Sequence, residues 1–225
     1  MDAGDHASCV NTMRRTKEKA TATRELLLDC AELAFVHHGV ARTTLQDIAN
    51  AAGLTRGAIY HHFTDKPALI EAMLARIDLP LEHALTAMEA QADIDPMAQL
   101  RQFALEPMAL LQRDEHARRV FTILMHRMEF AGDTAQLLAR HQATLADCQS
   151  RCERLFRAAQ RAGQLPASRV PRQAALALMA IISGLLSLAT LDDDPAPACL
   201  AAPATVDALL NGLRTGDPTA LAAPV

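Results

Sequence analysis

Residues Thr43 to Lys66 carry the sequence TTLQDIANAAGLTRGAIYHHFTDK, which predicts two short helices joined by a tight turn. Thr44 and Asp47 form a capping-box pattern, because each side chain can satisfy a backbone amide at the start of a helix. Gly53 follows this helix where a chain needs a left-handed residue, a conformation that glycine adopts without steric cost. The first helix has one apolar face, at the i, i+3, i+4 and i+7 spacing: Leu45, Ile48, Ala49 and Ala52.

The second short helix has the pattern of a major-groove reader. Thr55 can cap it, and Ala58, Ile59 and Phe63 can face inward. The outer face is rich in hydrogen-bond donors and suits the B-DNA major groove, although an ordinary helical hairpin with a solvated face is the alternative. Gly57 favours DNA, because glycine inside a helix costs about 1 kcal/mol relative to alanine. We expect the DNA-binding residues to be Thr44, Thr55, Arg56, Gly57, Ala58, Tyr60, His61 and Lys66.

The composition predicts an all-α protein. Half of the 225 residues are hydrophobic and only 3% are aromatic, with alanine and leucine dominant and no credible alternating strand. The net charge is −4, yet all three lysines and many arginines lie between residues 14 and 66. A local basic patch binds phosphate on an acidic molecule, because screening weakens distant charges beyond about 8 to 10 Å. We expect no secretory signal, no membrane span and a cytoplasmic location.

A resemblance to a known family starts at Met13 and extends to about Leu74. Its residues include Arg42-Thr43-Thr44-Leu45, Thr55-Arg56-Gly57-Ala58-Ile59-Tyr60 and His62-Phe63. The stretch resembles the DNA-binding domain of TetR-family repressors, and most of all the multidrug efflux regulators of the AcrR and TtgR type. His61 departs from that subgroup, which commonly has tryptophan there. The resemblance implies a repressor of an efflux pump operon, bound to a palindromic DNA operator and released by a small hydrophobic effector.

Turn-forming prolines, glycines and aspartates divide the chain into segments. We expect a disordered extension at 1–12, a three-helix helix-turn-helix DNA-binding domain at 13–64, a connector helix at 65–80, a helical ligand-binding and dimerisation domain at 81–216, and a disordered tail at 217–225. Pro80 should limit or bend the connector. The basic segment 14–19 either reaches DNA or is a solvated tail, and Met13 is a hypothetical start. Helices are expected at 20–38, 65–77, 81–91, 96–112, 116–130, 134–162, 171–191 and 204–215.

The second domain should hold the regulatory ligand. Flexible apolar side chains such as methionine can repack around ligands of different shapes. A row of methionines at helical spacing is, however, also typical of an ordinary hydrophobic core. Glu129 and Ser183, with His126 and Asp147, are further hypotheses for fixing a polar group. The predicted ligand-binding residues are Met88, Phe103, Met108, Phe121, Met125, Met128, Glu129, Met179 and Ser183.

The segment Ala174–Leu191 is apolar around most of its circumference, and Ser183, Gly184 and Ser187 allow close backbone approach. It predicts a homodimer seam, with Val206, Leu209, Leu210 and Leu213 beside it. The alternative is a central helix of a monomer, which would read too little DNA for useful specificity.

Five cysteines without a CxxC pair fit a reducing compartment. Cys148 and Cys152 lie one helical turn apart. This spacing is compatible with three interpretations: metal ligands, a redox pair, or small residues of the core. A metal- or redox-responsive repressor is therefore the second hypothesis, although we assign no metal site and no cofactor. A helical enzyme is a remote third hypothesis, with no catalytic residues, because GxSxG, HExxH, P-loop and GxGxxG motifs are missing from the sequence.

Overall fold

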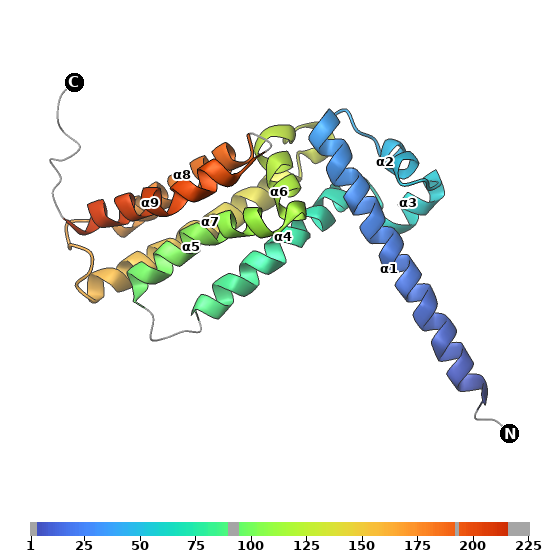
Figure 1. Cartoon of the computed structure of the whole chain (residues 1–225), viewed down its shortest axis with the longest axis horizontal. Helices are drawn as coiled ribbons and strands as arrows, with labels where there is room; N and C mark the ends of the chain where they lie inside the picture. Colours follow the sequence, from blue (N-terminus) through green and yellow to red (C-terminus); the bar gives the residue numbers. More distant parts are fainter. Residues whose placement is uncertain (1–3, 90–94, 192–193, 216–225) are drawn as a thin grey trace.

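The computed structural model describes residues 4–89, 95–191 and 194–215, and side chains for 17–77, 95–191 and 194–215. All secondary structure in these ranges is helical, which confirms the predicted all-α class. Three helices form the N-terminal end, and a long α4 leads into a second, larger group (Figure 1). The elements are α1 (Gly4–His38), α2 (Leu45–Ala51), α3 (Arg56–His62), α4 (Lys66–Glu89), α5 (Pro96–Arg113), α6 (Glu115–Thr122), a π-helix η1 (Ile123–Arg127), a 3-10 turn η2 (Gly132–Thr134), α7 (Leu137–Arg161), α8 (Pro171–Ala189) and α9 (Ala196–Arg214).

The helix-turn-helix forms as its local sequence predicts. Thr44 and Asp47 make both hydrogen bonds of the capping box, at 3.2 Å from the Asp47 amide to Thr44 Oγ1 and 2.9 Å from the Thr44 amide to Asp47 Oδ2. Gly53 has a φ of +67°, so the chain leaves α2 in the left-handed conformation. Behind the two short helices lies a core of fully buried side chains from α1, α2, α3 and α4: Leu27, Leu28, Phe35, Ile48, Ile59 and Leu69.

Several predicted boundaries are wrong. Residues 4–12, expected to be disordered, are helical, because no proline or capping signal stops α1 from extending toward the N-terminus. We expected a connector helix at 65–80 followed by a separate helix at 81–91. Instead, α4 continues as one helix through Pro80 to Glu89. α9 begins at Ala196 and continues through Pro203, where we expected a start at residue 204. One proline removes only one backbone donor, so a long helix can continue past it. The predicted disordered tail at 217–225 lies outside the described residues.

The predicted helix 116–130 changes type midway. α6 ends at Thr122, and the chain continues as the π-helix η1, which ends before Met128. The carbonyl of Arg127 accepts a hydrogen bond of 3.1 Å from the amide of Val40, two residues beyond the end of α1. The π-helix therefore contacts the segment that leads into the helix-turn-helix.

An ion-pair network joins α1 to α4 and α6. Glu32 is fully buried, and its two oxygens lie 2.5 Å from Arg76 Nη1 and 3.0 Å from Arg119 Nε. Arg76 also binds Glu25 at 2.6 Å and Asp29 at 2.7 Å. Burial alone would lower the pKa of Arg76, but the hydrogen bonds that Arg76 donates to these three carboxylates more than reverse that effect and raise the pKa. The network holds α1 of the DNA-binding domain against the second domain.

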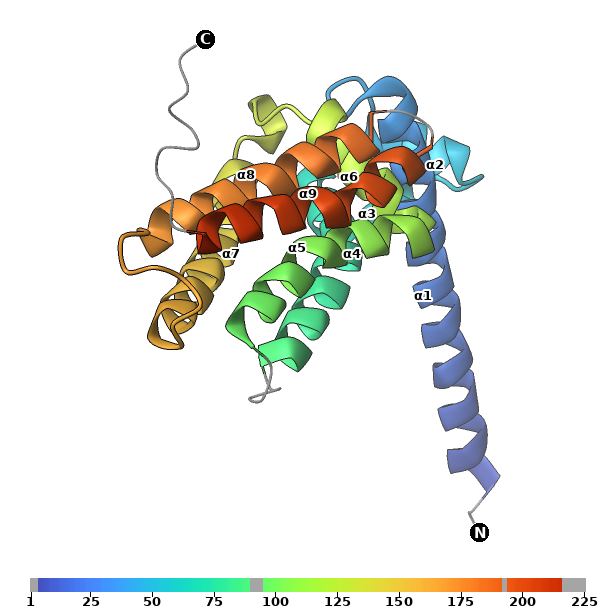
Figure 2. The ribbon, with the colours of Figure 1, turned by 60° about the vertical axis from the view of Figure 1, so that its left-hand side comes forward.

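α8 and α9 lie side by side (Figure 2), and both helices have exposed apolar residues. α8 is also the one helix in the described residues that is long and apolar enough to cross a membrane, contrary to our expectation of none. Its buried face packs on α7 and α9, which is typical of a bundle helix. The exposed residues of the two helices include Leu176, Ala180, Gly184, Leu188, Leu200, Ala201, Ala204 and Ala208.

Candidate DNA interface and effector cavity

The outer face of α3 combines an arginine with an aromatic ring. The Arg56 guanidinium lies 5.5 Å from the centroid of the Tyr60 ring, one helical turn away, and Tyr60 is 45% exposed. Thr55 caps the helix by accepting a hydrogen bond from the Ala58 amide at 3.3 Å. Arg56, Gly57, Tyr60 and His61 are exposed, whereas Ala58 is half-buried. The predicted reader thus presents one contiguous polar surface on α3.

Gly57 has no reason within the protein to be glycine. A Cβ added there would meet only the Thr55 hydroxyl, at 3.9 Å. Because glycine weakens a helix by about 1 kcal/mol, its use here fits close approach by an external partner.

Lys66 has an internal role that its sequence position did not predict. Its Nζ lies 3.1 Å from the carbonyl of Val40 and 3.4 Å from that of Thr43. An ammonium has three donors, so two of them tie the start of α4 to the turn between α1 and α2. A phosphate contact by Lys66 stays a prediction and would use the third donor.

A cavity of about 500 Å³ lies inside the second domain. Helix α4 contributes Leu74 and Ile77, and α5, α6, η1, α7 and α8 form the other walls. Six of the predicted ligand-binding residues line it: Phe103, Phe121, Met125, Met128, Met179 and Ser183.

The other three predicted ligand-binding residues are not seen to line the effector cavity. Met108 is buried but does not line the cavity, so it belongs to the hydrophobic core of its domain. Glu129 is exposed outside the cavity wall, because the π-helix ends before it and the chain leaves the domain interior. The Met88 side chain lies outside the described residues.

Polar residues of α7 also line the cavity, and of these only Asp147 was among our hypotheses from the sequence. Arg140, His141, Thr144, Asp147 and Arg151 recur at helical spacing on one face of this helix. That spacing was visible in the sequence, but a polar stripe on a long helix is more commonly a solvated surface.

The charges in the cavity wall are balanced by partners. Arg151 Nε binds Asp147 Oδ2 at 2.7 Å, and Glu106 of the wall binds Arg113 at 2.6 Å. His141 stacks on Phe130 with the ring centroids 5.2 Å apart, and burial lowers the pKa of His141, which favours the neutral ring. The cavity therefore presents an apolar interior and aromatic faces without a net charge.

The structure does not favour the cysteine-based alternative. Cys148 lines the cavity, whereas Cys152 is buried. Burial, together with the neighbouring Cys148, raises the pKa of the Cys152 thiol to about 12. Since thiolates are the reactive and metal-binding form, Cys152 is poorly suited to sensing.

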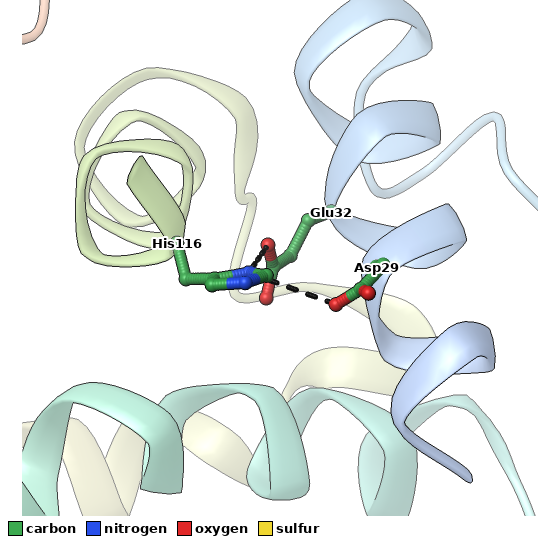
Figure 3. Close-up of side chains that lie close together, drawn as sticks. All are labelled: Asp29, Glu32 and His116. Atoms are coloured by element: carbon green, nitrogen blue, oxygen red, sulfur yellow. Dashed lines mark hydrogen bonds and ion pairs between the residues drawn. The ribbon is translucent and has the colours of Figure 1, made fainter. Parts of the chain in front are cut away.

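Potential metal ligands gather elsewhere, in the ion-pair network. Asp29, Glu32 and His116 place one ligand atom each within 4.8 Å of the others (Figure 3). His116 Nδ1 lies 2.9 Å from Glu32 Oε2 and 3.6 Å from Asp29 Oδ1. The guanidinium groups of Arg76 and Arg119 already bind these carboxylates, so the cluster is an ion-pair network and not a fitting cation site.

Comparisons with known proteins match both halves of the chain. Residues 27–73 match "Bacterial regulatory proteins, tetR family", and residues 95–215 match "MAATS-type transcriptional repressor, C-terminal region". The chain is 39% identical over 174 residues to the HTH-type transcriptional regulator TtgR of Pseudomonas putida, covering 77% of this chain and 83% of that protein. It is 32% identical over 173 residues to the regulator AcrR of Shigella flexneri, covering 77% and 80%.

Solved structures agree with these sequence matches. NalD, the secondary repressor of the MexAB-OprM multidrug efflux pump in Pseudomonas aeruginosa, has a TM-score of 0.76 and 35% identity, covering 88% of this chain and all of that one. A SmeT–triclosan complex has a TM-score of 0.69 and 35% identity, covering 83% and 90%. The chain therefore belongs to the TetR family of DNA-binding transcriptional repressors, which are not enzymes, and carries a C-terminal region of the MAATS type.

Proposed function

We propose that this protein is a cytoplasmic homodimer that represses a multidrug efflux pump operon and leaves its palindromic operator when a small hydrophobic effector binds. The observation that carries the proposal is the cavity of about 500 Å³ whose wall includes α4. The same helix begins at Lys66, beside the helix-turn-helix. The relatives AcrR, TtgR, NalD and SmeT support the efflux assignment, since two of these names state efflux-pump repression.

The switch needs an effector that distinguishes two arrangements of the protein. Leu74 and Ile77 contact the cavity two to three helical turns beyond Lys66, so a ligand that displaces them also displaces the start of α4. An effector shifts the equilibrium only by its differential affinity for the two arrangements, and about 1 to 3 kcal/mol is typical.

The exposed surface of α8 and α9 supports the homodimer, although the predicted residues need correction. Val206 and Leu210 face the core of their own protomer, so they are not seam residues. The surface available to a partner is the one with Gly184 and Leu188 on α8 and Leu200 on α9, where Leu188 is 61% and Leu200 76% exposed. An apolar face of this kind is typical of a helix-on-helix interface.

Triclosan tests the effector cavity. Ala143 lines the cavity from α7, whereas Ala146 on the same helix is exposed outside it. We expect wild-type protein and Ala146→Phe to bind triclosan saturably and to release operator DNA. Ala143→Phe should lose triclosan binding, because the ring occupies the cavity, while keeping its operator affinity. Equal triclosan binding by both variants, measured by calorimetry, would place the effector elsewhere.

Arg56→Ala tests the DNA reader. We expect the variant to keep its fold and to lose about 1 to 3 kcal/mol of discrimination between operator and unrelated DNA, because one base contact from the exposed face is removed. Fluorescence anisotropy with the two DNAs at fixed salt measures this difference. An unchanged preference for the operator would show that Arg56 does not read bases.

A further inference from the structure

A second cavity, of about 320 Å³, adjoins the π-helix. η1 contributes Leu124 and Met125 to the effector cavity, and His126 and Arg127 to this second one. Val36 of α1 and Thr190 at the end of α8 also line it. The second cavity therefore lies where the DNA-binding domain, the π-helix and α8 meet.

The wall of this cavity is basic. Arg118, Arg119 and Arg127 line it, and no acidic residue does among the residues that the structure describes. Arg119 is neutralised by Glu32 at 3.0 Å and Glu115 at 2.8 Å. Within the part of the chain that the structure describes, the guanidinium groups of Arg118 and Arg127 have no ion pair and no hydrogen bond. Two uncompensated positive charges thus border the same space.

The polar groups between these arginines are held in place. Thr190 Oγ1 donates a hydrogen bond of 2.7 Å to the carbonyl of Leu186. His126 Nε2 lies 3.0 Å from Thr190 Oγ1 and 3.2 Å from the carbonyl of Ser187. Since the Thr190 hydrogen is already used, Nε2 carries the proton and donates. The imidazole is thereby held against the end of α8.

We propose that the second cavity binds a small anion bearing a phosphate or carboxylate group. A guanidinium offers planar, paired donors that match both groups, and a bound anion relieves the repulsion between Arg118 and Arg127. The site is separate from the apolar effector cavity, and its occupant contacts both the DNA-binding domain and the π-helix. An anionic metabolite would therefore act on the repressor from a site of its own.

Calorimetry of the full chain, without DNA, tests the proposal with inorganic phosphate and with citrate in chloride buffer at constant ionic strength. We expect saturable binding of at least one probe. The double variant Arg118→Gln, Arg127→Gln should bind it about tenfold more weakly or worse, since two charge-assisted contacts are lost. The double variant Arg161→Gln, Arg214→Gln is the matched control, because it removes two charges from exposed positions at the ends of α7 and α9, and it should bind like the wild type.

Three results would overturn the proposal. The first is that neither probe gives saturable binding, and the second is that all three proteins bind equally, as general anion effects on stability would produce. The third concerns Asp192 and Asp193, which follow Leu191 in the sequence and lie outside the described residues. Binding that occurs only after both are changed to asparagine would show that the chain's own carboxylates fill the cavity.

Discussion

Replacing Arg76 by glutamine is expected to destabilise the protein by about 3 to 5 kcal/mol, the cost of removing one partner from a buried ion pair. Arg76 is the cation that three carboxylates of α1 share, and one of these, Glu32, has no contact with solvent. In the variant, Glu25 and Asp29 lose the cation that lies between them, and Glu25 keeps only its longer contact of 3.4 Å with Arg24. Glu32 keeps only Arg119 and His116. Urea unfolding measures the loss.

The matched control is Arg101→Gln. Arg101 binds Asp207 at 2.6 Å, but both side chains are over 40% exposed. Exposed pairs contribute at most about 1 kcal/mol, because water screens them. Similar losses for the two variants would show that the network at Arg76 contributes no more than a surface pair.

Gly184→Leu is expected to convert the dimer to monomers and to reduce operator affinity about a thousandfold or more, toward the level of non-specific DNA. A Cβ added at Gly184 meets nothing within 4 Å in its own protomer, so the fold tolerates the side chain. Leucine also favours helix over glycine. The added side chain would instead separate the two α8 helices of the proposed dimer, and each protomer would then offer one half-site reader.

Light scattering at micromolar concentration, together with anisotropy on operator DNA, decides the outcome. Ala146→Leu, on the exposed face of α7, is the control and should remain dimeric. A Gly184→Leu protein that stays dimeric would place the interface away from α8.

The features predicted from sequence alone are those that depend on a few neighbouring residues. The Thr44–Asp47 box and the turn at Gly53 follow from local backbone chemistry, and both are present. The expectation that Pro80 limits the connector helix was wrong, because a proline's local cost does not show whether packing elsewhere offsets it. Val206 was misplaced for a related reason. An apolar stripe indicates burial without saying whether its own core or a partner covers it.

The ion-pair network and the second cavity could not be predicted at all. Glu25 and Arg76 are 51 positions apart, and Val36 and Thr190 come from opposite ends of the chain. Such pairs meet only after the helices are arranged in space. The polar wall of α7 had a visible spacing, but nothing in the sequence said which face points inward.

The π-helix has a consequence for how the wall between the two cavities can move. A π-turn holds one residue more than an α-turn, and each residue of an α-helix advances about 100° around the axis. If the π-turn moved by one residue along the helix, a few backbone hydrogen bonds would change partners. The side chain at that position would then rotate by about 100° around the helix axis. Met125 and His126, which line different cavities, are adjacent in η1. A small shift in helical phase would thus alter the lining of both cavities without unfolding a helix.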